Sequence, residues 1–364
     1  MSNIRAVSAQ QPGTGTPTAH GEGDARIESG ADVVCLGESM VTFLPSRPGR
    51  LADVPSFRRT IGGAESNVAC ALALAGHRAK WVSRVGDDGF GTHLLDAIGA
   101  YGVDVADVTR DPHRRTGIYF RTADDRDDAT HEVAYYRAGS AASAMSPATV
   151  PPSSLYATRI LHLSGITAAL SADCLDLMRT LCTPAAGRPL LSFDVNHRPS
   201  LWTSGATGAR VLLDLARGAD LVFVGEDEAE AAWGVRGGVH AVREALPEPA
   251  VLVVKQGAAG ATVFADGGVH HVPAPRVDVV APVGAGDAFA AGFLSATLRG
   301  LDVPLRLRHG HLTAAAALTV PGDVAAVPAE GLADELAALD ADAWERLRLS
   351  PGWTETGPQQ EVRT

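Results

Sequence analysis

Short apolar runs alternate along the chain with longer segments in which apolar residues recur every three or four positions. The short runs predict buried β-strands, and the periodic segments predict helices with an apolar face. The predicted strands lie at 33–36, 41–44, 80–85, 160–163, 190–194, 221–224 and 251–254, and the predicted helices at 66–76, 94–100, 172–183, 207–218, 226–246, 288–298 and 312–318. Such alternation is typical of an α/β fold with a largely parallel sheet.

The alternation is interrupted by two stretches rich in β-branched and aromatic residues. Residues 116–122 and 131–137 flank an acidic turn at 124–128, and this arrangement predicts an antiparallel hairpin. We expect the hairpin to form a small sheet with the extended residues near 41–61, and this sheet to stand off the main domain.

Composition indicates one globular domain with two polar ends. Of the 364 residues, 46% are hydrophobic and 20% are charged, which is ordinary for a folded domain. Residues 1–30 are rich in Gly, Thr, Gln and Ala and lack apolar periodicity, so we predict a disordered extension there. On the same grounds residues 346–364 are predicted to be a flexible tail, which leaves 31–345 as the domain.

The net charge and the cysteines indicate which binding partners and which cellular compartment to expect. A net charge of −11 argues against a nucleic-acid partner, because phosphate backbones are bound by clustered Lys and Arg. No uncharged apolar run approaches the roughly 20 residues of a membrane span, so no membrane partner is expected. Cys35, Cys70, Cys174 and Cys182 lie in apolar surroundings without a C-x-x-C pair, which favours buried reduced thiols. These features predict a cytoplasmic protein.

The strongest local signal for chemistry is the loop Gly284-Ala285-Gly286-Asp287, which runs directly into a predicted helix. Small residues let the backbone approach a ligand, and the free N–H groups of a helix start attract anions such as a transferring phosphoryl group. Asp287 can there accept a proton from a hydroxyl beside the phosphate. A glycine turn with Asp287 as a plain helix cap is the alternative, and for this motif alone it is the more common arrangement.

A second glycine cluster shifts the balance toward catalysis. Gly62-Gly63 precedes the helix predicted at 66–76 and sets Asn67 near its start. The side-chain amide of Asn67 can both donate to and accept from a substrate hydroxyl. Ordinary turn and cap chemistry is again the alternative.

Two arginines stand where an anionic substrate can be held. Arg137 follows Tyr135-Tyr136 at the end of the predicted hairpin, and Arg198 follows the strand predicted at 190–194. Arginine binds carboxylates through paired hydrogen bonds, and neighbouring aromatic faces suit a sugar ring. A surface salt bridge is the alternative for either arginine.

A third loop, Lys255 to Ala261, follows a predicted strand and resembles a phosphate or nucleotide turn. It does not match a Walker A loop, and no Rossmann G-x-G-x-x-G follows the first strand, which disfavours a dinucleotide enzyme. The acidic residues at 226–230 begin another predicted helix. Most such runs are solvated faces, but one carboxylate can hold Mg²⁺ through water.

These segments occur together, and in the order seen in the ribokinase-like (PfkB) carbohydrate kinase family. Gly62 to Gly76 resembles the N-terminal signature of that family, and Pro282 to Leu294 resembles its C-terminal one. The resemblance spans roughly residues 32–330. It implies a three-layer α/β/α domain with a mostly parallel sheet and a small β-sheet lid from about 40–61 and 115–138.

Within the family the chain is most similar to the 2-keto-3-deoxygluconate kinases. The segments that carry this similarity are Gly37-Glu38, Gly62 to Glu65, Tyr135 to Ala141, His162 to Ile166 and Asp194 to Trp202. The resemblance implies an ATP- and Mg²⁺-dependent kinase that phosphorylates the terminal hydroxyl of a sugar acid, with 2-keto-3-deoxygluconate as the expected substrate. A kinase for a neutral sugar or a nucleoside remains open, as does a non-catalytic sugar or nucleotide sensor. In relatives the lid often forms a dimer interface, so a homodimer or larger homo-oligomer is implied.

The resemblance also implies roles for individual residues. Those expected to line the sugar-acid site are Gly63, Ala64, Asn67, Tyr119, Tyr135, Arg137, Ile166 and Arg198. Those expected to line the ATP site are Gly225, Lys255, Gly257, Gly260, Ala261, Gly284, Gly286 and His311. By the same resemblance Asp287 is the general base, the Gly284–Asp287 loop with Ala285 and Gly286 is the anion hole, and Glu228 holds Mg²⁺.

Three positions depart from the family pattern. An N-x-x-E motif that the family ties to Mg²⁺ and phosphate reads Gly225-Glu226-Asp227-Glu228 here, so the Asn is lost. Ala281 replaces an Asp, which argues against a family-type monovalent-cation site. His311 stands where an Asn near the adenine is common.

Overall fold

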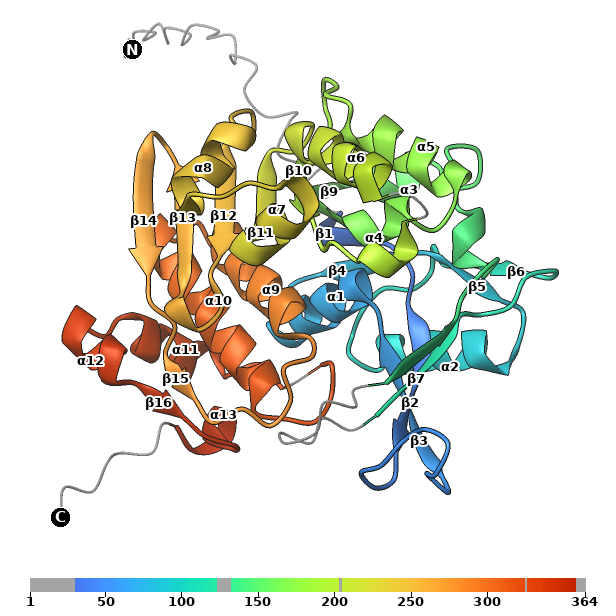
Figure 1. Ribbon diagram of the computed structural model, residues 1–364, viewed down its shortest axis with the longest axis horizontal. Helices are drawn as coiled ribbons and strands as arrows, with labels where there is room; N and C mark the ends of the chain where they lie inside the picture. The colour runs from blue at the N-terminus through green and yellow to red at the C-terminus, as the bar shows by residue number, and fades with distance from the viewer. Residues whose placement is uncertain (1–29, 123–131, 203–204, 325, 358–364) are drawn as a thin grey trace, which may run out of the picture.

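The computed structural model describes residues 30–122, 132–202, 205–324 and 326–357. Its centre is an eight-stranded sheet with the order β14-β13-β12-β11-β10-β9-β1-β4 (Figure 1). The strands are β1 (Ala31–Leu36), β4 (Ala79–Val82), β9 (Thr158–Ser164), β10 (Leu190–Asp194), β11 (Leu221–Gly225), β12 (Val251–Lys255), β13 (Ala261–Ala265) and β14 (Gly268–Val272). All neighbours from β4 to β12 are parallel, and β13 and β14 add antiparallel pairs. The predicted α/β fold with a largely parallel sheet is confirmed.

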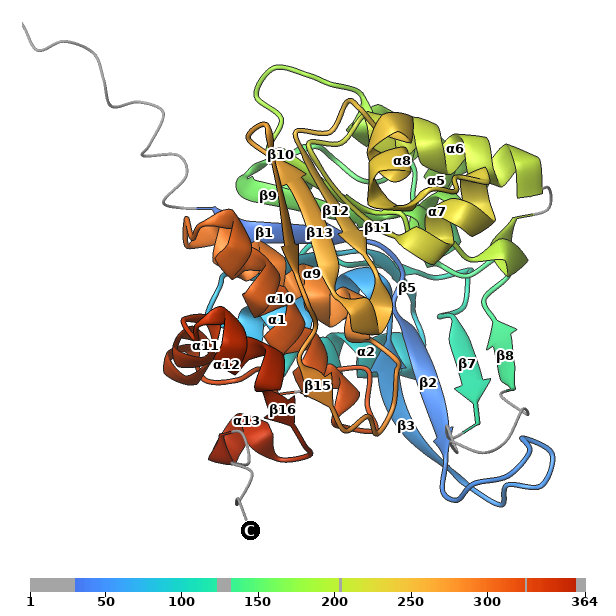
Figure 2. The ribbon, with the colours of Figure 1, turned by 60° about the vertical axis from the view of Figure 1, so that its left-hand side comes forward.

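Helices cover both faces of this sheet (Figures 1 and 2). One layer consists of α1 (Ala64–Leu74), α9 (Ala285–Leu298) and α10 (Val303–Leu318), and the other of α5 (Ala172–Cys182), α6 (Gly205–Arg217), α7 (Glu226–Trp233) and α8 (Gly238–Ala245). The two layers follow from the alternation of side chains along a strand. Val33 and Cys35 of β1 pack with the first layer, whereas Val34 and Leu36 pack with the second. The domain therefore has three layers.

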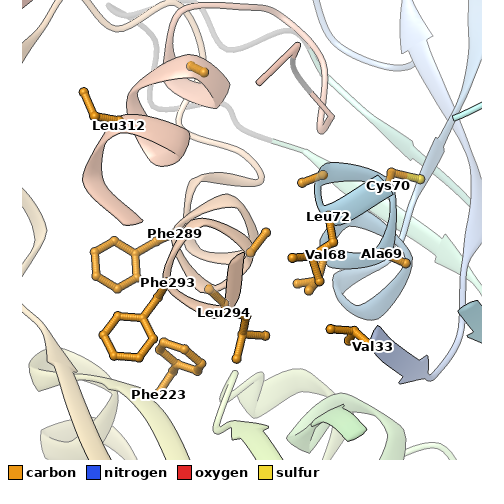
Figure 3. Packing of buried hydrophobic residues seen from close by; sticks show 14 of the residues in the cluster. Val33, Val68, Ala69, Cys70, Leu72, Phe223, Phe289, Phe293, Leu294 and Leu312 are labelled. Atoms are coloured by element: carbon orange, nitrogen blue, oxygen red, sulfur yellow. The ribbon is translucent and has the colours of Figure 1, made fainter. Parts of the chain in front are cut away.

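The layer of α1, α9 and α10 contains the core nearest to the candidate site (Figure 3). Phe293 of α9 is fully buried, and its ring centre lies 5.5 Å from that of Phe223 of β11 in an edge-to-face arrangement. Val68 and Leu72 of α1 are buried in the same cluster. Burial of each large apolar side chain contributes about 1.5–3 kcal/mol. This packing holds α1 against α9, and so fixes the starts of both helices relative to each other.

A four-stranded sheet stands off the main domain (Figure 2). It consists, in order, of β3 (Phe57–Gly62), β2 (Met40–Pro45), β7 (Ile118–Arg121) and β8 (Val133–Tyr136), and is called the lid sheet below. Tyr119 of β7 lies opposite Tyr135 of the antiparallel β8, which confirms the predicted hairpin. Phe43 packs the lid sheet onto α2 (Gly89–Gly99), with its ring centre 4.7 Å from that of Phe120 and 5.8 Å from that of Phe90. The acidic turn predicted at 124–128 lies outside the described residues.

Two predicted elements are each divided in the structure. The helix predicted at 226–246 is α7 followed by α8, because Gly234 (φ 65°) and Gly237 (φ 116°) adopt the left-handed conformation that ends helices. The strand predicted at 80–85 is β4 followed by β5 (Arg84–Gly86). β5 leaves the main sheet and pairs with β6 (Thr109–Asp111).

The C-terminal segment also differs from its prediction. β16 (Arg348–Leu349) pairs with β15 (Arg276–Val277), and α13 (Trp353–Thr356) follows it. Leu349 and Trp353 are buried and anchor this segment, so residues 346–357 pack on the domain instead of forming a flexible tail. Residues 358–364, and residues 1–29 of the predicted extension, lie outside the described residues.

The remaining elements are short or peripheral. They are α3 (Ser153–Tyr156), α4 (Gly165–Ala168), α11 (Glu330–Ala337), α12 (Ala341–Arg346) and the 3₁₀ turns η1 (Ala142–Ala144), η2 (Pro199–Leu201) and η3 (Gly257–Ala259). All four cysteines are buried. In the part of the chain that the structure describes, no helix combines the length and apolarity needed to cross a membrane.

Candidate active site

Several polar side chains, among them the predicted site residue Lys255, lie where the parallel strands end. Glu38 follows β1, Ser164 ends β9, Asp194 ends β10 and Lys255 ends β12. Parallel strands have their carboxyl ends at one edge of the sheet, which is where open α/β sheets bind ligands. The polar side chains at these strand ends therefore gather along one edge.

The loop Gly284–Asp287 forms the start of α9 at this edge. Gly284 is the N-cap with φ 78°, a conformation that favours glycine, and a Cβ there would collide with the backbone carbonyl oxygen of Asp323. The first N–H groups of a helix have no partner within the helix, so those of the next three residues are available to an anion. A Cβ on Gly286 would lie 3.7 Å from Nζ of Lys255, so an ammonium group flanks the same turn.

Asp287 is half-buried in this turn, and its Oδ2 accepts a 2.8 Å hydrogen bond from Nδ2 of Asn67 on α1. Burial raises the pKa of Asp287 to about 7; the Asn67 hydrogen bond opposes the rise and the charge of Asp194 adds to it. The cations Lys255 and Arg198 also oppose it. A carboxyl group whose pKa lies near neutral pH is suited to accept a proton during catalysis, whereas a plain helix cap needs no such pKa.

Lys255 and Asp194 form an ion pair beside this carboxylate. Nζ of Lys255 donates to the two carboxylate oxygens of Asp194 at 3.0 and 3.1 Å. Burial lowers the pKa of Lys255, but the carboxylates of Asp194, Glu228 and Asp287 outweigh that effect, and the net shift is upward. Lys255 is therefore protonated at neutral pH and supplies positive charge next to the helix start.

Asn67 contacts Asp287 and is also predicted to contact the sugar that accepts the phosphoryl group. Its Nδ2 donates a hydrogen bond to Asp287, whereas its Oδ1 is buried and has no hydrogen-bond partner within the described parts of the chain. Leaving such an oxygen unpaired costs about 1–3 kcal/mol, which a donating substrate hydroxyl removes. Gly63 and Ala64 lie one turn earlier, and a Cβ on Gly63 would collide with the carbonyl oxygen of Glu38. The glycine thus lets α1 begin close to the end of β1.

Ile166 is held near the start of α1 by a buried carboxylate. The hydroxyls of Ser164 and Thr167 donate to Oε1 of Glu65 at 2.8 and 3.0 Å. Burial raises the pKa of Glu65, and these two hydrogen bonds oppose the rise. Because Ser164 and Thr167 flank it, the half-buried Ile166 is fixed relative to α1.

The lid residues predicted to contact the sugar already have partners. The buried Tyr119 donates from its hydroxyl to Oδ2 of Asp323 at 3.0 Å. Arg137 forms an ion pair with the buried Glu38, and its guanidinium carbon lies 5.9 Å from the ring centre of Tyr135. Tyr135 is 49% exposed, and its ring centre is 5.3 Å from that of Tyr119. The positive charge of Arg137 is therefore balanced within the protein.

Arg198 has a different environment. Its side chain is exposed, and its Nη1 donates to the carbonyl oxygen of the preceding residue at 3.1 Å. No carboxylate of the described residues lies within ion-pairing distance of it, yet it is close enough to lower the pKa of Asp287. Of the two predicted carboxylate-binding arginines, only Arg198 has a charge that no described carboxylate balances.

Glu228 and Gly225 lie at the start of α7. Oε2 of Glu228 accepts from the N–H of Gly225 at 2.7 Å, and Oε1 accepts from the N–H of His197 at 3.0 Å. Both oxygens are thus engaged by the backbone. Across the described ranges, no group of three or more His, Cys, Asp or Glu side chains could hold a metal ion.

The predicted nucleotide loop places its glycines in left-handed conformations, with φ 56° at Gly257 and 121° at Gly260. The Cβ position of Gly257 faces open space, and Ala261 begins β13 as a buried residue. His311 is buried on α10, with Nε2 3.0 Å from the carbonyl oxygen of Val272, and burial lowers its pKa to about 4. These contacts of His311 are those of a packed core residue, so its role at the adenine stays a prediction.

Three acidic residues at the site have no role assigned from the sequence. They are Glu38 beside Arg137, Asp194 beside Lys255, and Asp323 beside Tyr119. Glu38 and Asp194 carry a usable signal, because each lies at or just after the end of an apolar strand. Asp323 follows a helix in a loop and has no comparable signal.

Comparison with known proteins identifies the family. Residues 31–330 match the model of the pfkB family carbohydrate kinases. The chain is 37% identical to the 2-dehydro-3-deoxygluconokinase of Bacillus subtilis (strain 168), over 84% of this chain and 96% of that protein. It is 35% identical to the enzyme of the same name from Thermoproteus tenax, over 86% and 97%. It is also 30% identical to Fructokinase-2 of Zea mays, over 84% and 92%.

Solved structures agree. A PfkB protein from Polaromonas sp. JS666 is 36% identical, with a TM-score of 0.74 over 85% of this chain and 100% of that one. The 2-dehydro-3-deoxygluconokinase of Thermotoga maritima is 25% identical, with a TM-score of 0.75 over 84% and 98%. The resemblance carried by the two glycine signatures is thus confirmed: the chain belongs to the pfkB family of carbohydrate kinases and is an ATP-dependent sugar kinase.

Proposed function

We propose that this kinase transfers the γ-phosphoryl group of ATP to the terminal hydroxyl of a sugar acid, 2-keto-3-deoxygluconate, with Asp287 as the general base. The observation that carries the proposal is the Asn67–Asp287 hydrogen bond at the start of α9, with the ammonium group of Lys255 beside the same turn. A proton acceptor, an anion-binding turn and a cation are the parts that phosphoryl transfer to a hydroxyl requires.

In this mechanism the acceptor hydroxyl lies between Asn67 and Asp287. Oδ1 of Asn67 helps to orient the substrate. The oxygen of the substrate hydroxyl attacks the γ-phosphorus in line with the departing ADP, and Asp287 takes the proton of that hydroxyl. The N–H groups of Ala285, Gly286 and Asp287 stabilise the charge on the transferring phosphoryl group, as an oxyanion hole does. Lys255 adds positive charge at the same place.

The nucleotide enters as its Mg²⁺ complex. Glu228 would hold the Mg²⁺ through water, because both of its carboxylate oxygens accept backbone N–H groups, from Gly225 and from His197. The ATP phosphates would lie along the loop from Lys255 to Ala261, where the open Cβ position of Gly257 leaves room for a close approach. We assign no monovalent cation to this mechanism, because Ala281 offers no carboxylate where the family pattern has an Asp.

A sugar acid is favoured over a neutral sugar by the charge balance of the arginines. Glu38 neutralises Arg137, whereas Arg198 retains a charge that a substrate carboxylate can pair with. The two 2-dehydro-3-deoxygluconokinases at 35% and 37% identity support the same substrate. The fructokinase at 30% identity defines the rival, a kinase of fructose or another neutral sugar.

The test is an ADP-release assay with a panel of sugar acids, neutral sugars and nucleosides. The proposal predicts the highest kcat/KM for 2-keto-3-deoxygluconate and a phosphate on its terminal hydroxyl by NMR. A higher kcat/KM for fructose or ribose would establish the neutral-sugar rival. Ligand binding without ADP release for any acceptor would indicate a sensor. A homodimer through the lid sheet is part of the proposal, and the molar mass from light scattering tests it.

A further inference from the structure

A second buried polar cluster joins the lid sheet to the main domain. Arg121, the last residue of β7, donates from Nη2 to Oδ1 of Asp323 at 3.0 Å. Tyr119 of the same strand donates to the other carboxylate oxygen at 3.0 Å. The side chains of Arg121 and Asp323 are only 5% and 3% exposed, so the ion pair is shielded from solvent. One carboxylate therefore holds two residues of the lid sheet.

The backbone of Asp323 contacts the anion-binding turn. Its carbonyl oxygen occupies the space that a Cβ on Gly284 would need, and Gly284 is the N-cap of α9. The side chain of Asp323 thus holds the lid sheet, while its main chain supports the turn that presents Asp287. Asp323 therefore contacts the lid sheet with its side chain and the Gly284 turn with its main chain.

The same cluster touches the start of α1. A Cβ on Gly62 would lie 2.6 Å from Oδ2 of Asp323 and would also collide with the hydroxyl of Tyr119. Gly62 precedes the first turn of α1, which carries Asn67. Glycine at this position lets the lid sheet, the Asp323 loop and the start of α1 meet in one place.

We propose that Arg121 is a positioning residue for phosphoryl transfer: through Asp323 it fixes the Gly284 turn relative to the lid sheet. Arginine suits this task because its rigid, permanently charged fork holds a carboxylate in one orientation. When Arg121 is present, its guanidinium holds the carboxylate of Asp323 in one orientation. Without Arg121, the buried carboxylate of Asp323 lacks this counter-ion. The segment 322–324 is then no longer held in a fixed position against the lid sheet. The inference rests on the proposed role of the Gly284–Asp287 loop.

The test compares Arg121→Met and Asp323→Asn, singly and together, with Arg58→Met as the matched control. Arg58 is an exposed arginine of β3 in the same lid sheet. For each variant kcat, the KM of each substrate, the thermal midpoint and the ratio of ADP released to sugar phosphorylated are measured. The ratio reports whether water competes as acceptor, which a correctly seated lid prevents.

Arg121→Met is expected to lower kcat at least about tenfold, because small misplacements of reacting groups cost up to about a hundredfold. The ratio of ADP to phosphorylated sugar should rise above that of the wild type. In the double variant the thermal midpoint should recover at least in part, because neither charge of the buried ion pair remains without the other. Its kcat should stay low, because the tie between lid sheet and turn is still missing. Arg58→Met should match the wild type in every readout.

Three results would overturn the inference. If kcat recovers together with the thermal midpoint in the double variant, or never falls in Arg121→Met, the pair is structural only. If Asp323→Asn raises the KM of the acceptor while kcat and the ADP ratio stay unchanged, Asp323 binds the sugar and does not position the turn. A wild-type chain that phosphorylates no acceptor would instead reject the proposed function.

Discussion

The phosphate side of the site and its acceptor side are built in different ways. On the phosphate side, the contiguous turn Gly284–Asp287 supplies the proposed base and the anion-binding N–H groups, with Lys255 beside it. On the acceptor side, residues come from α1, the lid sheet and the end of β10, and buried carboxylates balance most of the cations. Arg137 is paired with Glu38, for example. The reaction type is therefore encoded locally, whereas substrate choice depends on pairs of residues that are distant in sequence.

The largest expected effect is on the phosphate side. Asp287→Asn keeps the shape and the Asn67 contact but removes the proton acceptor, so kcat should fall about 10²–10⁴-fold while both KM values stay close to those of the wild type. Steady-state kinetics with the best acceptor measure both. A kcat within a few-fold of the wild type would return Asp287 to the role of a plain helix cap.

Asp287→Asn should also change how the stability of the protein depends on pH. The pKa of Asp287 is raised from 3.8 to about 7 by burial, so between these values the folded state binds a proton that the unfolded state has lost. Stability contributed by this group is present below the lower value and is lost as pH rises toward 7. Asp287→Asn should therefore raise the thermal midpoint relative to wild type at pH 8 but not at pH 4. A loss of midpoint at pH 8 would show that the variant perturbs the fold.

A smaller effect is expected from the cation beside the turn. Lys255→Met removes positive charge next to Gly286 and should lower kcat about tenfold to a hundredfold, as loss of one transition-state contact does. Because this variant also leaves Asp194 buried without its partner, Lys255→Met/Asp194→Asn is the control for folding. A rise in the KM of ATP with unchanged kcat would limit Lys255 to nucleotide binding.

The smallest effect is expected on the acceptor side, and it separates the two arginines. Arg198→Ala should raise the KM of the sugar acid about tenfold or more, since a hydrogen bond to a charged group contributes about 1.5–3 kcal/mol. Arg137→Ala should chiefly lower the thermal midpoint, because Glu38 is left as a buried, unpaired charge. The KM of a neutral sugar is the control for Arg198→Ala. Equal effects of Arg198→Ala on acid and neutral substrates would contradict the assignment of a carboxylate to that residue.

The sequence predicts the main fold well, because strands and helices in this chain have clear periodicities. The alternation of Val33 and Cys35 with Val34 and Leu36 places one strand between two layers, and the loop ending at Asp287 is visible as a short motif. The sequence does not predict the break between α7 and α8, because the apolar pattern continues across Gly234 and Gly237, which form it.

The acceptor side is less predictable because its contacts join distant segments. Arg121 and Asp323 are 202 positions apart, and neither has an informative neighbour in sequence. A sequence pattern identifies Arg137 as a candidate ligand for a carboxylate, but only the structure shows that Glu38 already balances it. Periodicity indicates which face of a helix or strand is buried. It carries no information about which buried charged residues form ion pairs with each other.

The most direct test of the account is the pH dependence of kcat/KM in the wild type and in Asn67→Ala. The proposed base must be ionised, so kcat/KM should fall as pH drops through about 7, the value to which burial raises the pKa of Asp287. Because the Asn67 hydrogen bond lowers that pKa, its removal should move the acidic limb of the profile to higher pH. A limb that stays in place in Asn67→Ala, or a rate independent of pH in this range, would contradict Asp287 as the base.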